Sequence, residues 1–389
     1  MELKGVHEPD LELFLIFHSR ESMQLFLENP FDFEFCTILH QYQIMPILLV
    51  KCKRDDIERL SSIDSIKNID VNFRCYLSNN TSLKIELSDT EIRNQLRRTP
   101  KNIGQGVRIA LVDSGIDIHN MNLKNQVIMK IDMTNEIWDD LVGHGTISAC
   151  LISEVAPKSK LIDVKVSTRA GLIHASDILL ALEKIYSIKC DILLFGVASP
   201  TLTNGNDVLS QMCKKMVENG TLIVSPAGNF GPEMNTIGFP IKVPNTFCIG
   251  SINSSGDISF FSSRNLEKPD FYVVGENVTS CSAFHGILGK AHPTHSNKRI
   301  VSGTSFSAAK FAGILAITKQ FFPEYNYTNL YDFFKYFNPV SRNLSIEKIK
   351  EKILELRPIV APFKRMILIS SIVSIFLFIF GISSIILFR

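Results

Sequence analysis

The architecture of this chain is set by one segment, Val301-Ser302-Gly303-Thr304-Ser305-Phe306-Ser307-Ala308-Ala309-Lys310-Phe311-Ala312-Gly313-Ile314-Leu315. The small residues at its start predict a turn, and the apolar run after them favours a helix. Ser305 stands at the mouth of that helix. A serine hydroxyl becomes a good nucleophile only when a neighbouring base removes its proton, so this position matters if a histidine and a carboxylate fold next to it. Taken alone, Ser305 is equally consistent with a helix cap.

Three further segments supply polar side chains of the kinds that such a serine needs. Arg108 to Asp117 has an apolar run that ends in Asp113, which is typical of a buried parallel strand with a carboxylate at its carboxyl end. His144 stands between two glycines just before a run that is compatible with a helix. Thr221 to Asn229 is a second buried-strand pattern, and its terminal amide can donate a hydrogen bond to a developing oxyanion. Ligand sites lie at the carboxyl ends of such strands, so we expect these side chains to converge.

In chain order, Asp113, His144, Asn229 and Ser305 resemble the site residues of the subtilisin family of serine proteases, whose triad runs aspartate, histidine, serine. The resemblance covers roughly residues 101 to 322. It implies an α/β fold of three layers with a mainly parallel sheet. It also implies that Ser305 is the nucleophile, His144 the general base, Asp113 the residue that orients the imidazole, and Asn229 a donor in the oxyanion hole.

The resemblance further implies where an extended peptide substrate binds. Relatives pair an edge strand with the substrate backbone, and here that strand falls within Asp191 to Ala198. We expect Phe195, Gly196 and Val197 to form the wall of the substrate site, and Ala227 and Gly228 to line its primary pocket. Phe195 is equally consistent with ordinary core packing.

The sequence predicts no cofactor and no metal site. Many relatives hold calcium in an Asn-rich loop, and the short segment between Ala149 and Val155 leaves no room for that loop. The net charge of +2, without a basic tract interleaved with aromatic residues, argues against nucleic acid as a partner. The eight cysteines contain no Cys-x-x-Cys pair, and we expect them to be reduced, buried thiols instead of a zinc site or a disulfide framework.

Residues 1 to 80 are predicted to form a small α+β domain, and residues 81 to 106 a linker. The residue patterns predict strands at 11–18, 35–39, 44–52 and 71–77, and helices at 19–28 and 55–63. The order βαββαβ is typical of a ferredoxin-like unit. In front of a subtilisin-like domain, it resembles the inhibitory, chaperone-like propeptide of that family. An unrelated α+β domain is the alternative.

The carboxyl-terminal part is predicted to hold a helical connector at 323–365 and a transmembrane helix at 366–388. The latter segment is uncharged throughout and dominated by Ile, Leu, Phe and Val, and about 20 such residues span a bilayer. Lys364 and Arg365 precede it, so the positive-inside tendency places the peptidase domain in the cytoplasm. The amino terminus has no signal-peptide pattern, which agrees with that orientation.

Together these features predict a membrane-anchored serine endopeptidase with its peptidase domain at residues 107–322. Its expected partners are a peptide or protein substrate, its own amino-terminal domain as an intramolecular inhibitor, and the membrane. Peptide maturation or protein turnover at the membrane is the role that fits these features. The alternative is a catalytically silent, membrane-anchored protein that holds peptides in the same cleft. Reaction of Ser305 with a fluorophosphonate distinguishes the two.

Overall fold

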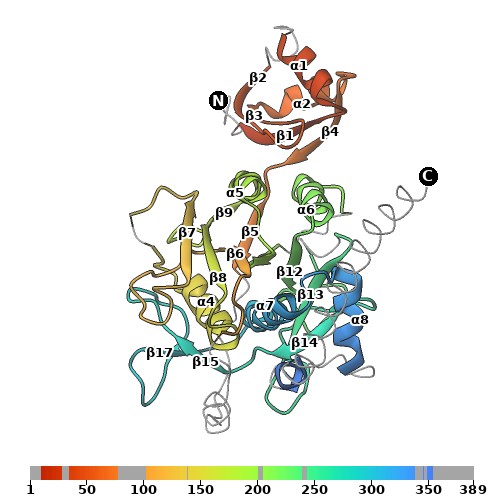
Figure 1. Ribbon diagram of the computed structural model, residues 1–389. Helices are drawn as coiled ribbons and strands as arrows, with labels where there is room; N and C mark the ends of the chain where they lie inside the picture. The colour runs from red at the N-terminus through yellow and green to blue at the C-terminus, as the bar shows by residue number, and fades with distance from the viewer. Residues whose placement is uncertain are drawn as a thin grey trace, which may run out of the picture.

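The computed structural model describes residues 10–28, 35–77, 102–137, 139–199, 205–238, 243–337, 345 and 348–353. A small N-terminal unit lies over a larger α/β unit, and the two are joined through a single extended strand (Figure 1). The predicted transmembrane segment 366–388 and most of the predicted linker 81–106 lie outside the described residues. Among the described residues, no helix combines the length and the apolar character needed to cross a membrane.

The large unit is built on a sheet of seven strands that all run parallel to their neighbours. The strand order is β14-β13-β12-β10-β6-β8-β7. Each central strand is buried on both faces, which explains why β6 is a continuous apolar run and does not alternate. The strands are β6 (Arg108–Asp113), β7 (Val127–Asp132), β8 (Lys160–Lys165), β10 (Ile192–Phe195), β12 (Leu222–Pro226), β13 (Thr246–Ile252) and β14 (Phe271–Val274).

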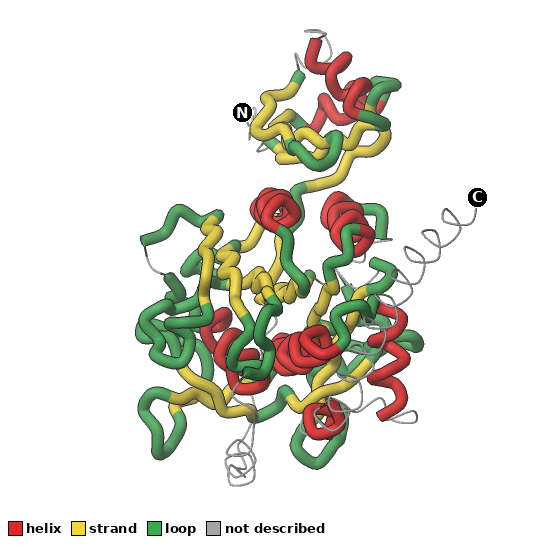
Figure 2. Tube along the Cα trace, viewed as in Figure 1, coloured by secondary structure: helices red, strands yellow, loops and turns green. Residues whose placement is uncertain are grey.

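Helices cover both faces of this sheet and complete the three layers (Figure 2). One face packs against α4 (His144–Val155) and α7 (Thr304–Phe321). The other face packs against α5 (Ala175–Ile188) and α6 (Val208–Glu218). The α7 helix is apolar on nearly every side because it is buried in the core, as the run that starts at Thr304 predicts. The predicted α/β fold with a large parallel sheet is thereby confirmed.

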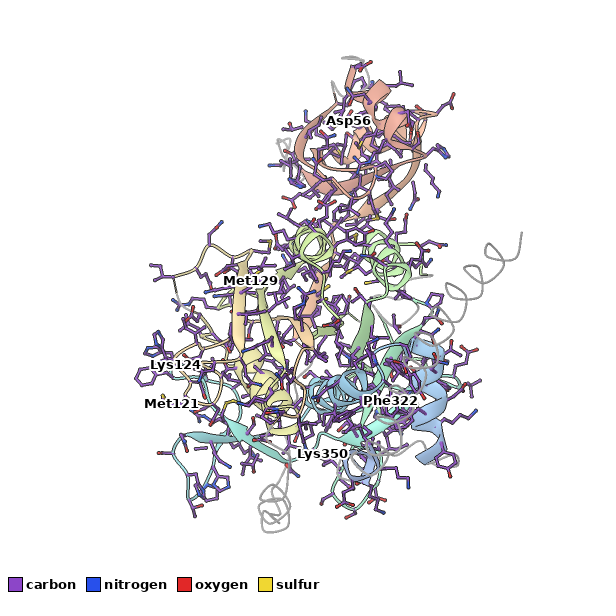
Figure 3. The ribbon with its side chains drawn as sticks, viewed as in Figure 1. Asp56, Met121, Lys124, Met129, Phe322 and Lys350 are labelled. Carbon is purple, nitrogen blue, oxygen red and sulfur yellow. A yellow bond between two sulfur atoms is a disulfide. The ribbon has the colours of Figure 1, made fainter. Side chains whose placement is uncertain are left out.

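Aromatic rings close the carboxyl-terminal side of this core, where α8 (Tyr327–Phe337) packs against the sheet. The rings of Phe247, Phe271, Phe311 and Phe334 lie 5.0–6.4 Å apart, centroid to centroid. Phe322, labelled in Figure 3, follows α7 directly. Its ring stacks on Tyr325 in the turn toward α8. This part of the predicted helical connector is therefore packed onto the core.

The N-terminal unit is an antiparallel sheet of four strands in the order β2-β3-β1-β4, with two α-helices. Alternate side chains of β1 face opposite ways: Leu13, Leu15 and Phe17 pack under the unit's own helices, while Phe14 and Ile16 join the core around α5 and α6. This sheet is therefore apolar on both faces. Its elements are β1 (Leu11–Phe17), α1 (Arg20–Glu28), β2 (Cys36–Gln41), β3 (Ile47–Cys52), the 3₁₀ turn η1 (Arg54–Asp56), α2 (Ile57–Ser61) and β4 (Ile66–Val71).

The strand predicted at 71–77 is in fact split. Its first residue ends β4, and its last four form β5 (Arg74–Leu77), which leaves the N-terminal unit and enters the large one. There β5 pairs antiparallel with both β9 (Ile173–His174) and β11 (Val197–Ala198). The sequence pattern missed this division because the short run between the two strands, Asn72-Phe73, does not carry a strong turn signal.

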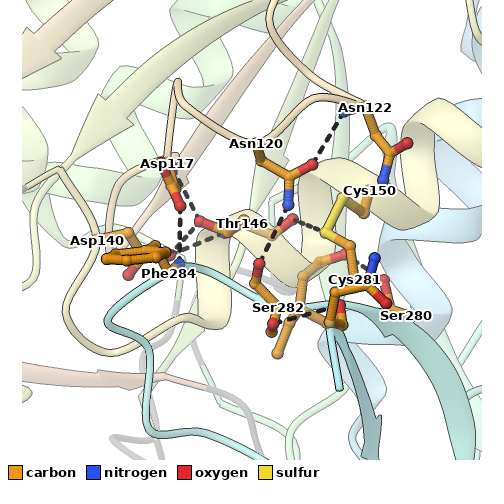
Figure 4. The surroundings of a disulfide bond; sticks show 12 residues. Asp117, Asn120, Asn122, Asp140, Thr146, Cys150, Ser280, Cys281, Ser282 and Phe284 are labelled. Carbon is orange, nitrogen blue, oxygen red and sulfur yellow. Dashed lines mark hydrogen bonds between the residues drawn. A yellow bond between two sulfur atoms is a disulfide. The ribbon is translucent and has the colours of Figure 1, made fainter. Parts of the chain in front are cut away.

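A second small sheet lies under α4 and contains β15 (Val278–Cys281), β17 (Lys298–Val301) and β16 (Lys290–Ala291). It corrects the expectation that all eight cysteines are reduced, because Cys281 on β15 forms a disulfide with Cys150 on α4 (Figure 4). The two residues are 131 positions apart, so only tertiary packing brings them together. The other six cysteines are free, and five of them are buried.

A buried acid interrupts the apolar character of β8. Asp163 is fully buried between Leu111 of β6 and Lys130 of β7, and neither carboxylate oxygen makes a well-formed hydrogen bond to another described residue. Burial raises the pKa of this carboxyl well above its ordinary range, and the nearby Ile116 N–H and Lys130 offset only part of that effect.

We predict that Asp163→Asn raises the free energy of unfolding at pH 8 and has a smaller effect at pH 5. Because the pKa is raised in the folded state, the unfolded chain loses this proton first as the pH rises, and unfolding becomes easier. Urea denaturation at both pH values, in a Ser305→Ala background, measures the difference. The exposed Asp332→Asn serves as the control, and an Asp163→Asn protein less stable than its parent at pH 8 would contradict the prediction.

Candidate active site

Three side chains from three separate elements meet at the carboxyl edge of the parallel sheet. His144 Nδ1 lies 2.8 Å from Asp113 Oδ1 and 2.9 Å from Asp113 Oδ2. His144 Nε2 lies 2.8 Å from Ser305 Oγ. In the neutral imidazole, Nδ1–H donates to the carboxylate and Nε2 accepts the serine O–H. A nucleophile, a base and an orienting carboxylate are thus joined in one chain of hydrogen bonds.

The local structure explains how these side chains reach one another. Asp113 is the last residue of β6, His144 is the first residue of α4, and Ser305 lies in the first turn of α7. Gly143 precedes the histidine with a φ of 91°, a left-handed conformation that favours glycine. The His144 ring also packs against Phe306, with 5.1 Å between the ring centroids.

Two glycines leave the space that Asp113 needs. A Cβ on Gly196 would collide with the Asp113 carboxylate, and a Cβ on Gly145 would collide with the backbone carbonyl of Gly115. Gly196 therefore contributes to the site by its lack of a side chain. Its N–H donates to the Val112 carbonyl over 2.9 Å, which fixes the end of β10 beside the triad aspartate.

Asn229 is held with its amide nitrogen available. Its Oδ1 accepts hydrogen bonds from Thr304 N at 3.0 Å and from Thr304 Oγ1 at 2.9 Å. Thr304 Oγ1 in turn accepts from Gly228 N, so its proton is committed to Asn229. The buried Nδ2 has no hydrogen-bond partner among the described residues. A buried, unpaired donor next to the Ser305 turn is what an oxyanion hole requires.

The residues expected to form the substrate site lie in two places: Phe195 and Val197 in β10 and β11, and Ala227 and Gly228 after β12. Phe195 does not form a substrate wall, because its side chain is fully buried in the core between the sheet and α5. Strand alternation explains this, since Gly196 faces the triad and both neighbours face the opposite side. Val197 is buried beneath β5 and offers its backbone to that strand. Ala227 and Gly228 follow β12 beside the Asn229 amide.

The place expected for an extended substrate is filled by the chain itself. Tyr76 is opposite Ala198 and Leu77 is opposite Val197, so β5 runs antiparallel along the edge strand toward Gly196 and the triad. Cys75 is opposite Ile173 on the other side and is buried. The two flanking strands hold β5 as the middle strand of a three-stranded sheet.

Sequence reasoning missed a group of polar residues behind the triad. Asp140 is buried and bonds to Ser114, Gly143 and Thr146, which flank Asp113 and His144. The acid four positions before the histidine was visible in the sequence, but nothing there indicated its burial. Within the described part of the chain, no group of three or more histidine, cysteine, aspartate or glutamate residues could hold a metal ion.

Comparison with known proteins identifies relatives of the large unit. The model of the subtilase family, peptidase S8, matches residues 104–336. Subtilisin E of Bacillus subtilis (strain 168) is 29% identical over 227 residues, which cover 55% of this chain and 55% of that protein. The chain therefore spans about half the length of subtilisin E. The major intracellular serine protease of the same organism is 28% identical over 241 residues, with coverage of 56% and 70%.

Two further relatives extend beyond the large unit. A thermostable alkaline protease of Halalkalibacterium halodurans is 23% identical over 329 residues, which cover 82% of this chain and 84% of that protein. The crystal structure of fervidolysin from Fervidobacterium pennivorans, a keratinolytic enzyme related to subtilisin, superposes with a TM-score of 0.72 at 15% identity. It covers 90% of this chain and 62% of its own. At that identity the structural match establishes the fold.

Proposed function

Since the chain belongs to the subtilase family, we propose that it is a serine endopeptidase that hydrolyses peptide bonds through an acyl-enzyme intermediate. The observation that carries this proposal is the unbroken set of hydrogen bonds from Asp113 through His144 to Ser305, beside the unpaired Nδ2 of Asn229. A protein that only held peptides would have no use for a base within 2.8 Å of a buried serine hydroxyl.

The geometry supports the following reaction. His144 Nε2 takes the proton of Ser305 as Oγ attacks the carbonyl carbon of the peptide, and the carbonyl oxygen becomes an oxyanion. Asn229 Nδ2 and the Ser305 backbone N–H donate to that oxyanion. His144 then gives its proton to the leaving amine, and the acyl group remains on Ser305. Water then gives a proton to His144 and attacks the acyl carbon. The bond from Ser305 Oγ to the acyl group breaks, the peptide acid leaves, and His144 returns the proton to Oγ.

We predict that a fluorophosphonate labels the protein and that Ser305→Ala abolishes labelling. Asn229→Ala should lower kcat by about 100 to 1,000-fold with little change in KM, because its amide acts only on the developing oxyanion. Peptide hydrolysis by each variant measures both constants, and the exposed amide Asn329→Ala is the matched control. A wild-type protein that stays unlabelled after its N-terminal unit is removed would favour the silent peptide-binding alternative.

We also propose that the N-terminal unit is a ferredoxin-like inhibitory domain. Three features support this: its strand order, the position of β5 along the β11 edge, and its contacts with two helices of the large unit. It caps α5, because Phe73 O accepts from Ala175 N and Asn72 Oδ1 accepts from Ser176 N. These N–H groups have no acceptor within their own helix, so the N-terminal unit supplies what the helix lacks.

The contact at α6 brings two carboxylates together. Asp70 Oδ2 accepts from Val208 N over 3.0 Å, while Asp207 caps the same helix through Ser210 N. Burial, and then the Asp207 charge, raises the pKa of Asp70, and its bonds to Val208 and Asn68 offset only part of this. Docking therefore favours the protonated form of Asp70, and the proposed inhibitory contact weakens as the pH rises above the ordinary range of an aspartate.

We predict that the wild-type protein becomes labelled by fluorophosphonate faster, relative to Asp70→Asn, as the pH rises from 4.5 to 7.5. The ratio of the two labelling rates cancels the pH dependence of the serine itself, and an asparagine keeps the acceptor for Val208 without the charge. We expect a severalfold rise in that ratio. The exposed Asp64→Asn should give a flat ratio, and a flat ratio for Asp70→Asn would contradict the proposed docking contact.

Finally, we propose that residues 366–388 anchor the protein in a membrane with the peptidase domain on the cytoplasmic side. Support comes from the apolar sequence and from Lys364 and Arg365 before it. The Cys150–Cys281 disulfide argues for the opposite side, because disulfides persist in oxidising compartments.

We predict that an added protease digests the peptidase domain in inside-out vesicles and spares it in right-side-out vesicles; the reverse pattern would overturn the orientation.

A further inference from the structure

We infer that Asp140 is a positioning residue that holds Asp113 and the first turn of the His144 helix in one rigid frame. The inference rests on the proposed peptidase function and adds a fourth side chain to the three that carry the reaction. Asp140 makes no described hydrogen bond to the His144 ring or to Ser305. It acts through the groups on either side of the histidine.

The carboxylate of Asp140 is buried and fully used. Its side chain is 4% exposed. Oδ1 accepts from Ser114 Oγ at 2.8 Å and from Gly143 N at 2.7 Å. Oδ2 accepts from Thr146 N at 2.9 Å and from Thr146 Oγ1 at 2.6 Å. Four donors thus converge on two oxygens. An ionised carboxylate can accept all four hydrogen bonds, whereas an amide has only one oxygen that accepts.

These four bonds connect the segment that carries Asp113 with the segment that carries His144. Ser114 follows Asp113 directly, and its N–H donates to Asp113 Oδ1 over 2.6 Å. The Ser114 hydroxyl, which donates to Asp140, accepts in turn from Gly145 N at 2.9 Å. The N–H groups of residues 143, 145 and 146 are therefore all tied to Asp140, directly or through Ser114. His144 lies inside this set of anchored peptide groups.

The start of α4 needs such a residue because its own cap cannot provide one. The N-cap of α4 is Gly143, which has no side chain to accept a hydrogen bond from the first turn. Asp140 supplies that acceptor from three positions upstream, and a negative charge at the N-terminus of a helix is favourable. The glycine supplies the left-handed turn, and Asp140 supplies the capping bonds.

A second set of contacts holds the same helix in place without Asp140. Cys150, in the second turn of α4, is bonded to Cys281 of β15, and Ser280 Oγ donates to the Ile147 carbonyl (Figure 4). The body of α4 is therefore held to the small sheet independently of Asp140. Loss of the Asp140 bonds should shift the first turn, which carries His144, while the rest of the helix stays in place.

The experiment compares Asp140→Asn with Asp270→Asn in the full chain. Asp270 is also 4% exposed and also accepts from a backbone N–H, that of Cys248, so it matches Asp140 in burial and in having a backbone donor. Its other donor is the Lys268 ammonium, and it lies at the amino end of β14, whereas the triad lies at the carboxyl edge of the sheet. We expect Asp140→Asn to lower kcat and the fluorophosphonate labelling rate by about 100-fold with KM within about threefold of wild type, since an error of about 1 Å in positioning costs that much. Asp270→Asn should leave kcat and the labelling rate near wild type below its melting temperature.

A milder pair of variants tests the same frame if Asp140→Asn does not fold. Thr146→Val keeps the size of the side chain and the backbone bond to Asp140. It removes both hydroxyl bonds, the one donated to Asp140 and the one accepted from Asp117 N, and Thr146→Ser restores both. We expect roughly a tenfold loss of labelling rate in Thr146→Val and recovery in Thr146→Ser. Equal labelling rates in the wild type, Thr146→Val and Thr146→Ser would overturn the inference. Equal losses of kcat in Asp140→Asn and Asp270→Asn would overturn it as well. A wild-type protein without peptidase activity would instead overturn the proposed function, so the two failures are distinguishable.

Discussion

The close contact between helices α4 and α7 determines whether this molecule has a site at all. Gly313 of α7 faces Val155 of α4 so closely that a Cβ at that position would lie 2.7 Å from the valine Cβ. His144 starts one helix and Ser305 lies in the first turn of the other, so the spacing of the helices sets the distance between imidazole and hydroxyl. Both helices lie on one face of the parallel sheet and begin at the edge where β6 ends in Asp113. The triad is thus a consequence of packing two helices against one sheet.

The second face of that sheet imposes a different requirement. Helices α5 and α6 bury one side against the sheet, and the N-terminal unit covers their other side with Phe14, Ile16, Tyr42, Ile47 and Leu49. The N-terminal sheet is apolar on both faces and so depends on this contact for the burial of half its surface. The chain that leaves the N-terminal unit continues as β5, which runs between β9 and β11 toward Gly196. The burial of the N-terminal sheet and the proposed inhibition therefore depend on the same interface.

The sequence allowed prediction of those parts that local pattern determines. A buried parallel strand, a glycine-flanked histidine and a small-residue turn before an apolar helix are visible without tertiary information, and the structure brings Asp113, His144 and Ser305 together. The features that could not be predicted from the sequence depend on contacts between distant segments. Cys150 and Cys281 meet only because β15 lies under α4. Phe195 turns into the core because the residue after it must face Asp113, which fixes the strand alternation.

Buried carboxylates at this edge of the sheet show how the same residue type can be stabilised or left unsatisfied. Asp113 and Asp140 are both buried, and each accepts hydrogen bonds from backbone and side-chain donors that replace part of the lost water. Burial still raises the pKa of Asp140, because its bonds to Thr146 and Gly143 compensate only in part. Asp163 lies on the neighbouring strand without a comparable set of donors, and the charge of Asp140 adds to the effect of burial on its pKa. A negative charge on Asp163 beside that of Asp140 would destabilise both groups. The raised pKa of Asp163 relieves this, because the protonated form of that carboxyl adds no charge beside Asp140.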